Sequence, residues 1–146
     1  MTAFQVQWDN GKKTVDVETV EQLDAALDRV EKERGPKGRV FVVDITKGED
    51  EIGVPIGLHM SVGHPVRNRV FWMGPGDGIG YEPELEPWHG EMIEFDYGHL
   101  PTEEVPEALR VSQEKAREAA REFIRTNERP TCLSWGSGRQ ARTRRP

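Results

Sequence analysis

The sequence predicts an α+β domain, in which a mainly antiparallel sheet of about six or seven strands has two helices packed on one face. Segments that alternate apolar and polar residues recur along the chain, and most of them are separated only by turns. Two other segments carry apolar residues at helical spacing. The 146 residues suit one domain with its own core, which we place at residues 1–136. Residues 137–146 form a basic tail that we expect to be disordered.

Local signals predict the first three elements. Residues 4–8 and 13–18 alternate in polarity, and the Asn-Gly pair between them is typical of a hairpin turn. Thr19 and Gln22 have the spacing of a capping box, and the apolar stripe that follows them predicts a helix. Gly35-Pro36 is expected to stop that helix.

Most of the remaining strands are predicted before the second helix. Residues 39–45 contain an unbroken apolar run, which suits a strand buried on both faces. Pro55 favours an edge or a bulge in the strand that follows. The stretch rich in Gly and Pro at residues 74–90 is expected to be a long loop, with a short strand at residues 79–82. Further strands are predicted at residues 52–60, 66–73 and 91–97.

The second helix is predicted to begin near Pro106, because Pro is favoured at the first helical position, and to run to about Thr126. Its alanines imply a close approach to the sheet. Asn127 and Pro130 are expected to end it, and residues 131–135 predict a final short strand.

Charge narrows the classes of partner. The net charge is −6, and the last eleven residues hold four arginines and no acid, which leaves −10 on residues 1–135. Nucleic acid and anionic membranes repel such a body, whereas a basic protein attracts it. An acidic surface that only maintains solubility is the alternative. We expect a cytoplasmic protein, because the chain has a single cysteine and no visible signal sequence. The acidic charge and the lack of a long apolar run lead us to expect that it binds neither nucleic acid nor membrane.

Residues for catalysis or metal binding do not form a recognisable pattern. Cys132 lies in an apolar strand, where a buried and inert thiol is the usual case. Ser61 and His64 are close in sequence but make no triad. None of the four histidines lies in a predicted helix or shows metal-ligand spacing. They are His59, His64, His89 and His99. We therefore expect no enzyme activity, no metal and no cofactor.

The glycines at positions 74, 76, 78 and 80 invite a nucleotide-binding interpretation. Their spacing differs from G-x-G-x-x-G, and no helix follows to direct its amides at a phosphate. A surface loop is favoured instead.

The candidate partner-binding site is the stretch after these glycines, where aromatic residues are interleaved with glutamates. Pro83 and Pro87 stiffen its backbone, and the three glutamates would share one side if the chain were extended. Rings supply buried area in protein interfaces, and carboxylates steer a basic partner. In the alternative, the rings fold back onto the body of the protein. The candidate contact residues are Asp77, Tyr81, Glu82, Glu84, Glu86, Trp88 and His89.

The C-terminal third resembles a known family. Ala116-x-x-x-Ala120-x-x-Phe123, followed by Arg129-Pro130-Thr131-x-Leu133-x-Trp135, is similar to the ending of the Immunity protein 1 family. The likeness extends more loosely over most of residues 4–135. Asn127 stands where this family commonly has Gly, and Asn also accepts the left-handed conformation. Phe123, Pro130 and Trp135 are expected to be structural members of the motif.

The family comprises predicted immunity proteins of bacterial polymorphic toxin systems. The resemblance implies that this chain neutralises a cognate toxin, often a nucleic-acid deaminase or a nuclease, by stoichiometric binding. Such a toxin has a basic cleft that an acidic protein could block. We expect a monomer or a weak homodimer. The alternatives are a small-ligand or nucleotide-binding domain that uses residues 74–90, and a hydrolase with a dispersed site.

Overall fold

The computed structural model describes residues 3–9, 11–33, 40–49, 51–64, 66–75, 78–86, 88–90, 93–96, 101–104 and 109–136. Its helices are α1 (Val20–Glu33) and α2 (Gln113–Thr126). Its strands are β1 (Phe4–Trp8), β2 (Lys13–Val17), β3 (Val40–Glu49), β4 (Pro55–Val62), β5 (Arg67–Asn68), β6 (Val70–Met73), β7 (Gly78–Tyr81), β8 (Ile93–Asp96), β9 (Pro101–Glu104), β10 (Val111–Ser112) and β11 (Ser134–Gly136).

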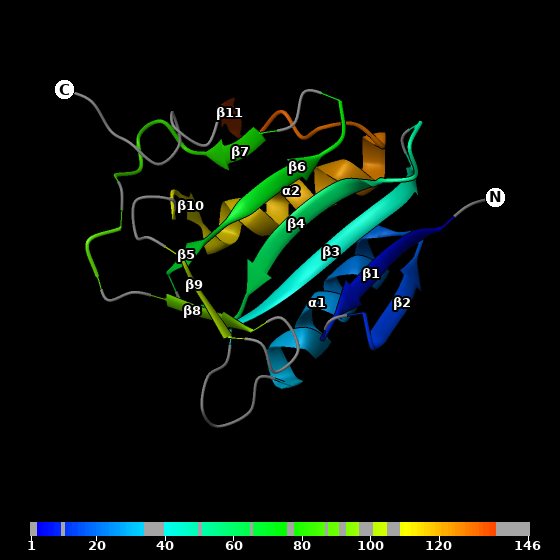
Figure 1. Ribbon diagram of the computed structural model, residues 1–146, viewed down its shortest axis with the longest axis horizontal. Coiled ribbons are helices and arrows are strands. Elements are labelled where there is room, and N and C mark those ends of the chain that lie inside the picture. Colours follow the sequence, from blue (N-terminus) through cyan, green and yellow to red (C-terminus); the bar gives the residue numbers. More distant parts are fainter. Residues whose placement is uncertain are drawn as a thin grey trace.

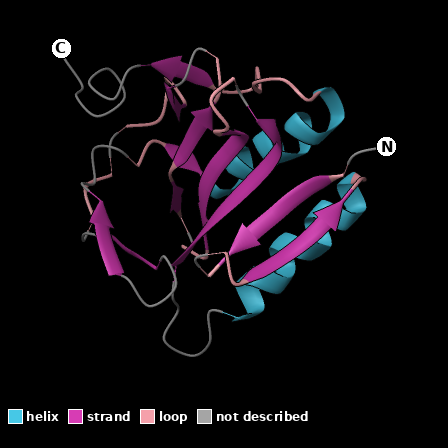
Figure 2. Ribbon diagram, turned by 45° about the vertical axis from the view of Figure 1, so that its right-hand side comes forward, coloured by secondary structure: helices cyan, strands magenta, loops and turns pink. Residues whose placement is uncertain are grey.

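The main sheet has an antiparallel path in the order β11-β7-β6-β4-β3-β1-β2. β8 pairs in parallel with the start of β3, and β9 pairs with β8. β5 and β10 form a separate pair. Both helices lie on the same face of the sheet (Figure 1), and the turned view in Figure 2 shows the same two layers. The predicted α+β class is therefore confirmed.

The N-terminal hairpin and the first helix follow their local signals. β1 and β2 are antiparallel, and their ladder ends at the pair Trp8 and Lys13. The turn between them has positive φ at Asp9 and Gly11. The backbone amide of Gln22 donates to Thr19 Oγ1 at 3.1 Å, and the Gln22 side chain accepts from the Thr19 amide at 3.3 Å. These two reciprocal bonds are the predicted capping box.

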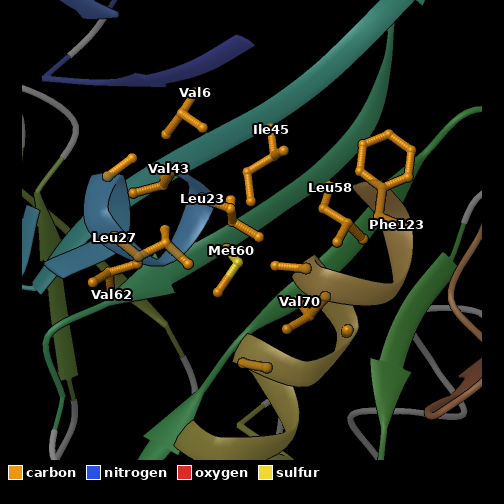
Figure 3. Packing of buried hydrophobic residues seen from close by; sticks show 14 of the residues in the cluster. Val6, Leu23, Leu27, Val43, Ile45, Leu58, Met60, Val62, Val70 and Phe123 are labelled. Carbon is orange, nitrogen blue, oxygen red and sulfur yellow. The ribbon is translucent and has the colours of Figure 1, made fainter. Parts of the chain in front are cut away.

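The core lies between the sheet and the helices (Figure 3), where side chains from β1, β3, β4, β6 and both helices interdigitate. Phe41, Val43 and Ile45 of β3 belong to this cluster. Val40 and Val42 face the opposite side and pack in a second cluster with Leu109. β3 is thus buried on both faces at its start, as its continuous apolar run predicts.

The prediction of one continuous strand at residues 66–73 is wrong. The structure has two strands there, β5 and β6, which are separated at Arg69. Ser61 of β4 explains the break. Its amide and its hydroxyl donate to Asn68 Oδ1 at 3.2 Å and 2.9 Å, and its Oγ accepts from the Arg69 amide at 3.2 Å. The Ser61 amide also donates to the Arg69 carbonyl at 3.1 Å, so side-chain and backbone bonds combine at the break, and β5 pairs with β10.

The predicted start of the second helix is also wrong, because α2 begins after Ser112. Ser112 is extended, with φ −74° and ψ 158°, and its Oγ accepts from the Lys115 amide. Val111 is completely buried and pairs with Asn68 of β5, which holds the preceding backbone in a strand. A serine N-cap and this tertiary pairing outweigh the preference of Pro for a helix start.

The other differences are smaller. Pro55 begins β4 opposite Glu49, next to a register shift after Thr46, so it lies at an irregularity as expected, although β4 is an interior strand. α2 ends at Thr126, and Asn127 is left-handed with φ 56°. β9 was not predicted.

Several predicted features lie outside the described residues: the helix stop at Gly35-Pro36, Pro106, both ends of the strand at 91–97, and the tail at 137–146.

Candidate partner-binding surface

The acidic loop, which we define as residues 82–90, follows β7. The Leu85 amide donates to the Glu82 carbonyl at 3.0 Å, so the loop begins with a turn and is not extended. The three glutamates therefore do not share one row. Glu84, Glu86 and His89 are exposed. Glu82 is half-buried, and its carboxylate accepts from the Ser112 amide at 2.6 Å. Asp77 lies outside the described residues.

A buried arginine holds the first half of this loop. Arg110 is 5% exposed, and its Nε donates to the Leu85 carbonyl at 3.1 Å. A second guanidinium nitrogen lies 3.4 Å from the Glu82 carbonyl and 3.4 Å from that of Pro83. The guanidinium carbon also lies 5.0 Å from the centre of the Tyr81 ring. Backbone carbonyls and an aromatic face thus compensate the buried cation, which orders the turn around it.

A second arginine holds the other half. One Arg67 nitrogen donates to the Glu86 carbonyl at 2.5 Å and to the Leu109 carbonyl at 2.8 Å. Its guanidinium lies 5.5 Å from the centre of the Trp88 ring system. Burial lowers the pKa of Arg67 from its ordinary value, the Glu82 carboxylate opposes this shift, and the Arg110 charge adds to it. The two arginines join the acidic loop to β5 and to the segment before α2.

Trp88 folds back onto the body of the protein, as in the alternative that the sequence left open. It packs against the cluster of Val40, Val42 and Leu109 on the face of the sheet without helices. His64 meets it edge-on at 5.5 Å and 80°. Trp88 and Tyr81 are both half-buried, so their rings mainly support the acidic loop.

The glycines before the acidic loop serve strand packing. Gly78 and Gly80 belong to β7, which lies between β6 and β11. A Cβ atom on Gly80 would come within 2.9 Å of Leu133, and one on Gly78 within 2.8 Å of the Gly136 carbonyl oxygen. Close approach to β11 therefore explains these two glycines, and their role in the sheet argues against a phosphate cradle.

A histidine and a carboxylate meet on the face of the sheet without helices. His59 Nδ1 lies 2.5 Å from Asp44 Oδ1, and an Arg69 nitrogen lies 3.1 Å from His59 Nε2. A guanidinium can only donate, so Nε2 accepts from Arg69 and Nδ1 donates to Asp44. The nitrogen that would take a proton from a nucleophile is thus occupied, which argues against an acid–base role for this pair.

The nucleophile candidates have structural partners. Ser61 is buried and bonds to Asn68, whereas His64 Nδ1 accepts from the amides of Val66 and Arg67 at 3.1 Å and 2.9 Å. Burial raises the pKa of Cys132 to about 11, and the nearby Glu122 charge adds to this shift, so the thiol is protonated at neutral pH. Among the described residues, no three His, Cys, Asp or Glu side chains are grouped to hold a metal ion. His99 lies outside those residues.

The C-terminal motif residues meet in the fold. Phe123 is fully buried and contacts Phe4 and Trp72 edge-on, at 5.1 Å and 5.5 Å. The Trp135 indole donates to the carbonyl of the buried Pro130 at 2.7 Å. The Arg129 guanidinium lies 5.5 Å from the Trp135 ring system. The motif thus joins α2 to the closing strand β11.

The family model of Immunity protein Imm1 matches residues 11–137, which is most of the chain. This chain belongs to the Imm1 family. A search of curated proteins found no match. As an Imm1 immunity protein, it has a toxin as its partner, and proteins of this kind are generally not enzymes. No helix in the described ranges is long and apolar enough to span a membrane.

Sequence reasoning about this Imm1 protein missed Arg67 and Arg110, which organise the candidate loop. Arg110 has a weak sequence signal, because it stands alone between Leu109 and Val111 in an apolar context. An arginine in such a position must find acceptors when it is buried. The identity of those acceptors depends on the tertiary fold.

Proposed function

We propose that this Imm1 family member neutralises a cognate polymorphic toxin domain by stoichiometric binding, and that the acidic loop contacts the toxin. The observation that carries this proposal is a loop whose exposed carboxylates, Glu84 and Glu86, lie on a backbone held by two arginines. A loop that is ordered before binding loses little conformational entropy when the complex forms.

The proposed toxin is a deaminase or a nuclease that acts on nucleic acid. Such an enzyme needs a basic cleft to hold its phosphate-rich substrate. Carboxylates at the mouth of that cleft would attract the immunity protein and exclude the substrate. Electrostatic steering of this kind raises association rate constants from about 10⁵–10⁶ to about 10⁸–10⁹ M⁻¹s⁻¹ at low salt.

Within this proposal, we assign the candidate contact residues two roles according to their exposure. Glu84, Glu86 and His89 are exposed and meet the toxin directly. The other residues support the loop through contacts with the body of the protein. Glu82 bonds to the Ser112 amide, the Tyr81 ring lies against Arg110, and the Trp88 ring lies against Arg67. Asp77 remains a candidate contact.

The first experiment tests binding and protection together. The protein encoded by the neighbouring gene is produced with this chain, and the complex is isolated and weighed. Cells that express the toxic protein are then supplied with the immunity protein. We expect a one-to-one complex and rescued growth. A folded and toxic neighbouring protein that neither binds nor is neutralised would overturn the proposal.

A charge-reversal variant tests the loop. Glu84→Lys combined with Glu86→Lys should slow association at least tenfold in low salt and flatten its salt dependence, because steering depends on these charges. The matched control reverses Glu18 and Glu21, two exposed acids at the start of α1, on the helix side of the molecule. Association kinetics by surface plasmon resonance give the measurement. Equal rates for both double variants would show that the acidic loop is not the steering surface.

A further inference from the structure

Tight protein interfaces need apolar anchors, and the acidic loop offers few. Energetic hot spots are large side chains that become fully desolvated in the complex. Tyr81 and Trp88 are half-buried and already contact Arg110 and Arg67. The large hydrophobic side chains that are exposed in the described residues are Ile52, Val54 and Val66. Two of these three lie together between β3 and β4.

The connection between β3 and β4, which we call the β3–β4 tip, comprises residues 49–55. Ile52 is 84% exposed and Val54 is 45% exposed. Toward the tip, the β3–β4 hairpin pairs with its neighbouring strands only as far as Thr46, which pairs with β1, and Gly57, which pairs with β6. The tip therefore extends past both neighbouring strands, as Figure 1 shows at the end of β3.

The conformation of the tip depends on its sequence. Gly48 and Gly53 have φ angles of +77° and +86°, which other residues rarely adopt. Glu49 pairs with Pro55 across the base of the tip, after the register shift that follows Thr46. The described residues of the tip, 49 and 51–55, thus present the aliphatic side chains on a turn that includes Gly53.

Charge surrounds these side chains. Glu51 precedes Ile52 in the chain, Glu49 lies opposite Pro55 at the base of the tip, and both glutamates are exposed. An aliphatic pair bordered by carboxylates complements an apolar pocket with a rim of lysine or arginine. We propose that the β3–β4 tip is the apolar anchor of the interface with the toxin, and that it inserts into such a pocket on a basic toxin domain. This inference rests on the proposed function.

The tip and the acidic loop can be reached by one partner. Strand pairing aligns His59 with Phe71 and Phe71 with Ile79, so Tyr81, just before the acidic loop, lies toward the end of β4. The tip lies before the start of β4. The six steps from Pro55 to Ser61 span about 20 Å at the usual rise of a strand. A standard interface of about 800 Å² per partner is about 30 Å across. A toxin that lies over the sheet face without helices would therefore reach both.

The experiment replaces the aliphatic pair without adding charge. Ile52→Ser combined with Val54→Ser should raise the dissociation rate constant and the Kd for the toxin at least tenfold. The association rate constant and its salt dependence should stay within twofold, because the carboxylates remain. Ala25→Ser, on the exposed face of α1, is the control and should leave both rate constants unchanged. Ile52→Val should retain most of the affinity, because it preserves the aliphatic surface.

The outcomes separate the inference from the proposed function. If the wild-type chain binds and neutralises the toxin but the double serine variant has a Kd within twofold of wild type, the tip is not the anchor and the function stands. If the wild-type chain does not bind the toxic neighbouring protein, the proposed function fails first. A melting temperature within about 2 °C of wild type establishes that the exposed substitutions leave the fold intact.

Discussion

Single residues combine several contacts, and Glu33 at the end of α1 is the clearest example. Its carboxylate accepts from Lys13 Nζ at 2.6 Å, from Arg29 Nε at 3.0 Å and from the Trp8 indole at 3.0 Å. Burial alone would raise the pKa of Glu33, but hydrogen bonds from Lys13, Trp8 and Arg29 outweigh it and lower the pKa from 4.5 to about 2. The end of α1 is thereby joined to both strands of the first hairpin.

This geometry predicts a defined acid sensitivity. The folded pKa of Glu33 lies below its unfolded value, so its stabilisation is complete above pH 4.5 and is lost as the pH falls toward 2. Between pH 6 and pH 3 the wild-type chain should lose about 2 kcal/mol more stability than Glu33→Gln. Urea unfolding at both pH values measures this difference, with Glu21→Gln on the exposed face of α1 as the control. Parallel losses in wild type and Glu33→Gln would contradict the assignment.

At the scale of elements, loops and helix ends stabilise one another. Ser112 caps α2 through its side chain and donates its amide to Glu82, so the start of the helix and the start of the acidic loop are joined. Arg110 lies two residues earlier and bonds to the same turn. The order of the acidic loop therefore depends on the start of α2 as well as on its own prolines.

We expect Arg110→Met to loosen the acidic loop. Methionine keeps most of the apolar stem but leaves the carbonyls of Glu82 and Leu85 without this donor, which should cost about 1–3 kcal/mol in stability. Hydrogen–deuterium exchange should accelerate at least tenfold at residues 82–90 and change little in α1. Arg125→Met, at an exposed position on α2, controls for the loss of charge. Unchanged exchange in the loop would show that Arg110 does not order it.

Across the whole molecule, part of the acidic charge is matched internally. Arg117 and Arg121 of α2 bond to acids of α1. Arg117 lies 3.0 Å from Asp28 and 3.5 Å from Asp24, and Arg121 lies 3.0 Å from Asp24. The two helices are thus joined by a charge network above a shared apolar core. The carboxylates left to attract a partner lie elsewhere, including the acidic loop and the β3–β4 tip.

Arg117→Met should weaken the contact between the helices by about 1 kcal/mol, because several partly exposed pairs are lost together. The loss should be larger in 50 mM salt than in 1 M salt, where screening already weakens these pairs. Urea unfolding at the two salt concentrations gives the comparison, and Arg125→Met again serves as the control. A loss that does not depend on salt would indicate that Arg117 acts through its packing alone.

The sequence by itself determined the features that depend on neighbouring residues. The hairpin, the Thr19 capping box, the two-sided burial of β3 and the left-handed Asn127 each follow from a pattern a few residues long. Periodicity and caps act over that range, so they can be recognised before the fold is known.

Only the tertiary structure decided the partners of isolated polar residues. Arg67 bonds to Leu109, which is 42 residues away, and Arg121 bonds to Asp24, which is 97 residues away. Other contacts between distant residues set the element boundaries: Val111 pairs with Asn68 before α2 begins, and Ser61 bonds to Asn68 beside the break at Arg69. The physical reason is that a partly or fully buried donor bonds to whichever acceptor the packed chain brings near it, and distance along the sequence does not restrict that choice.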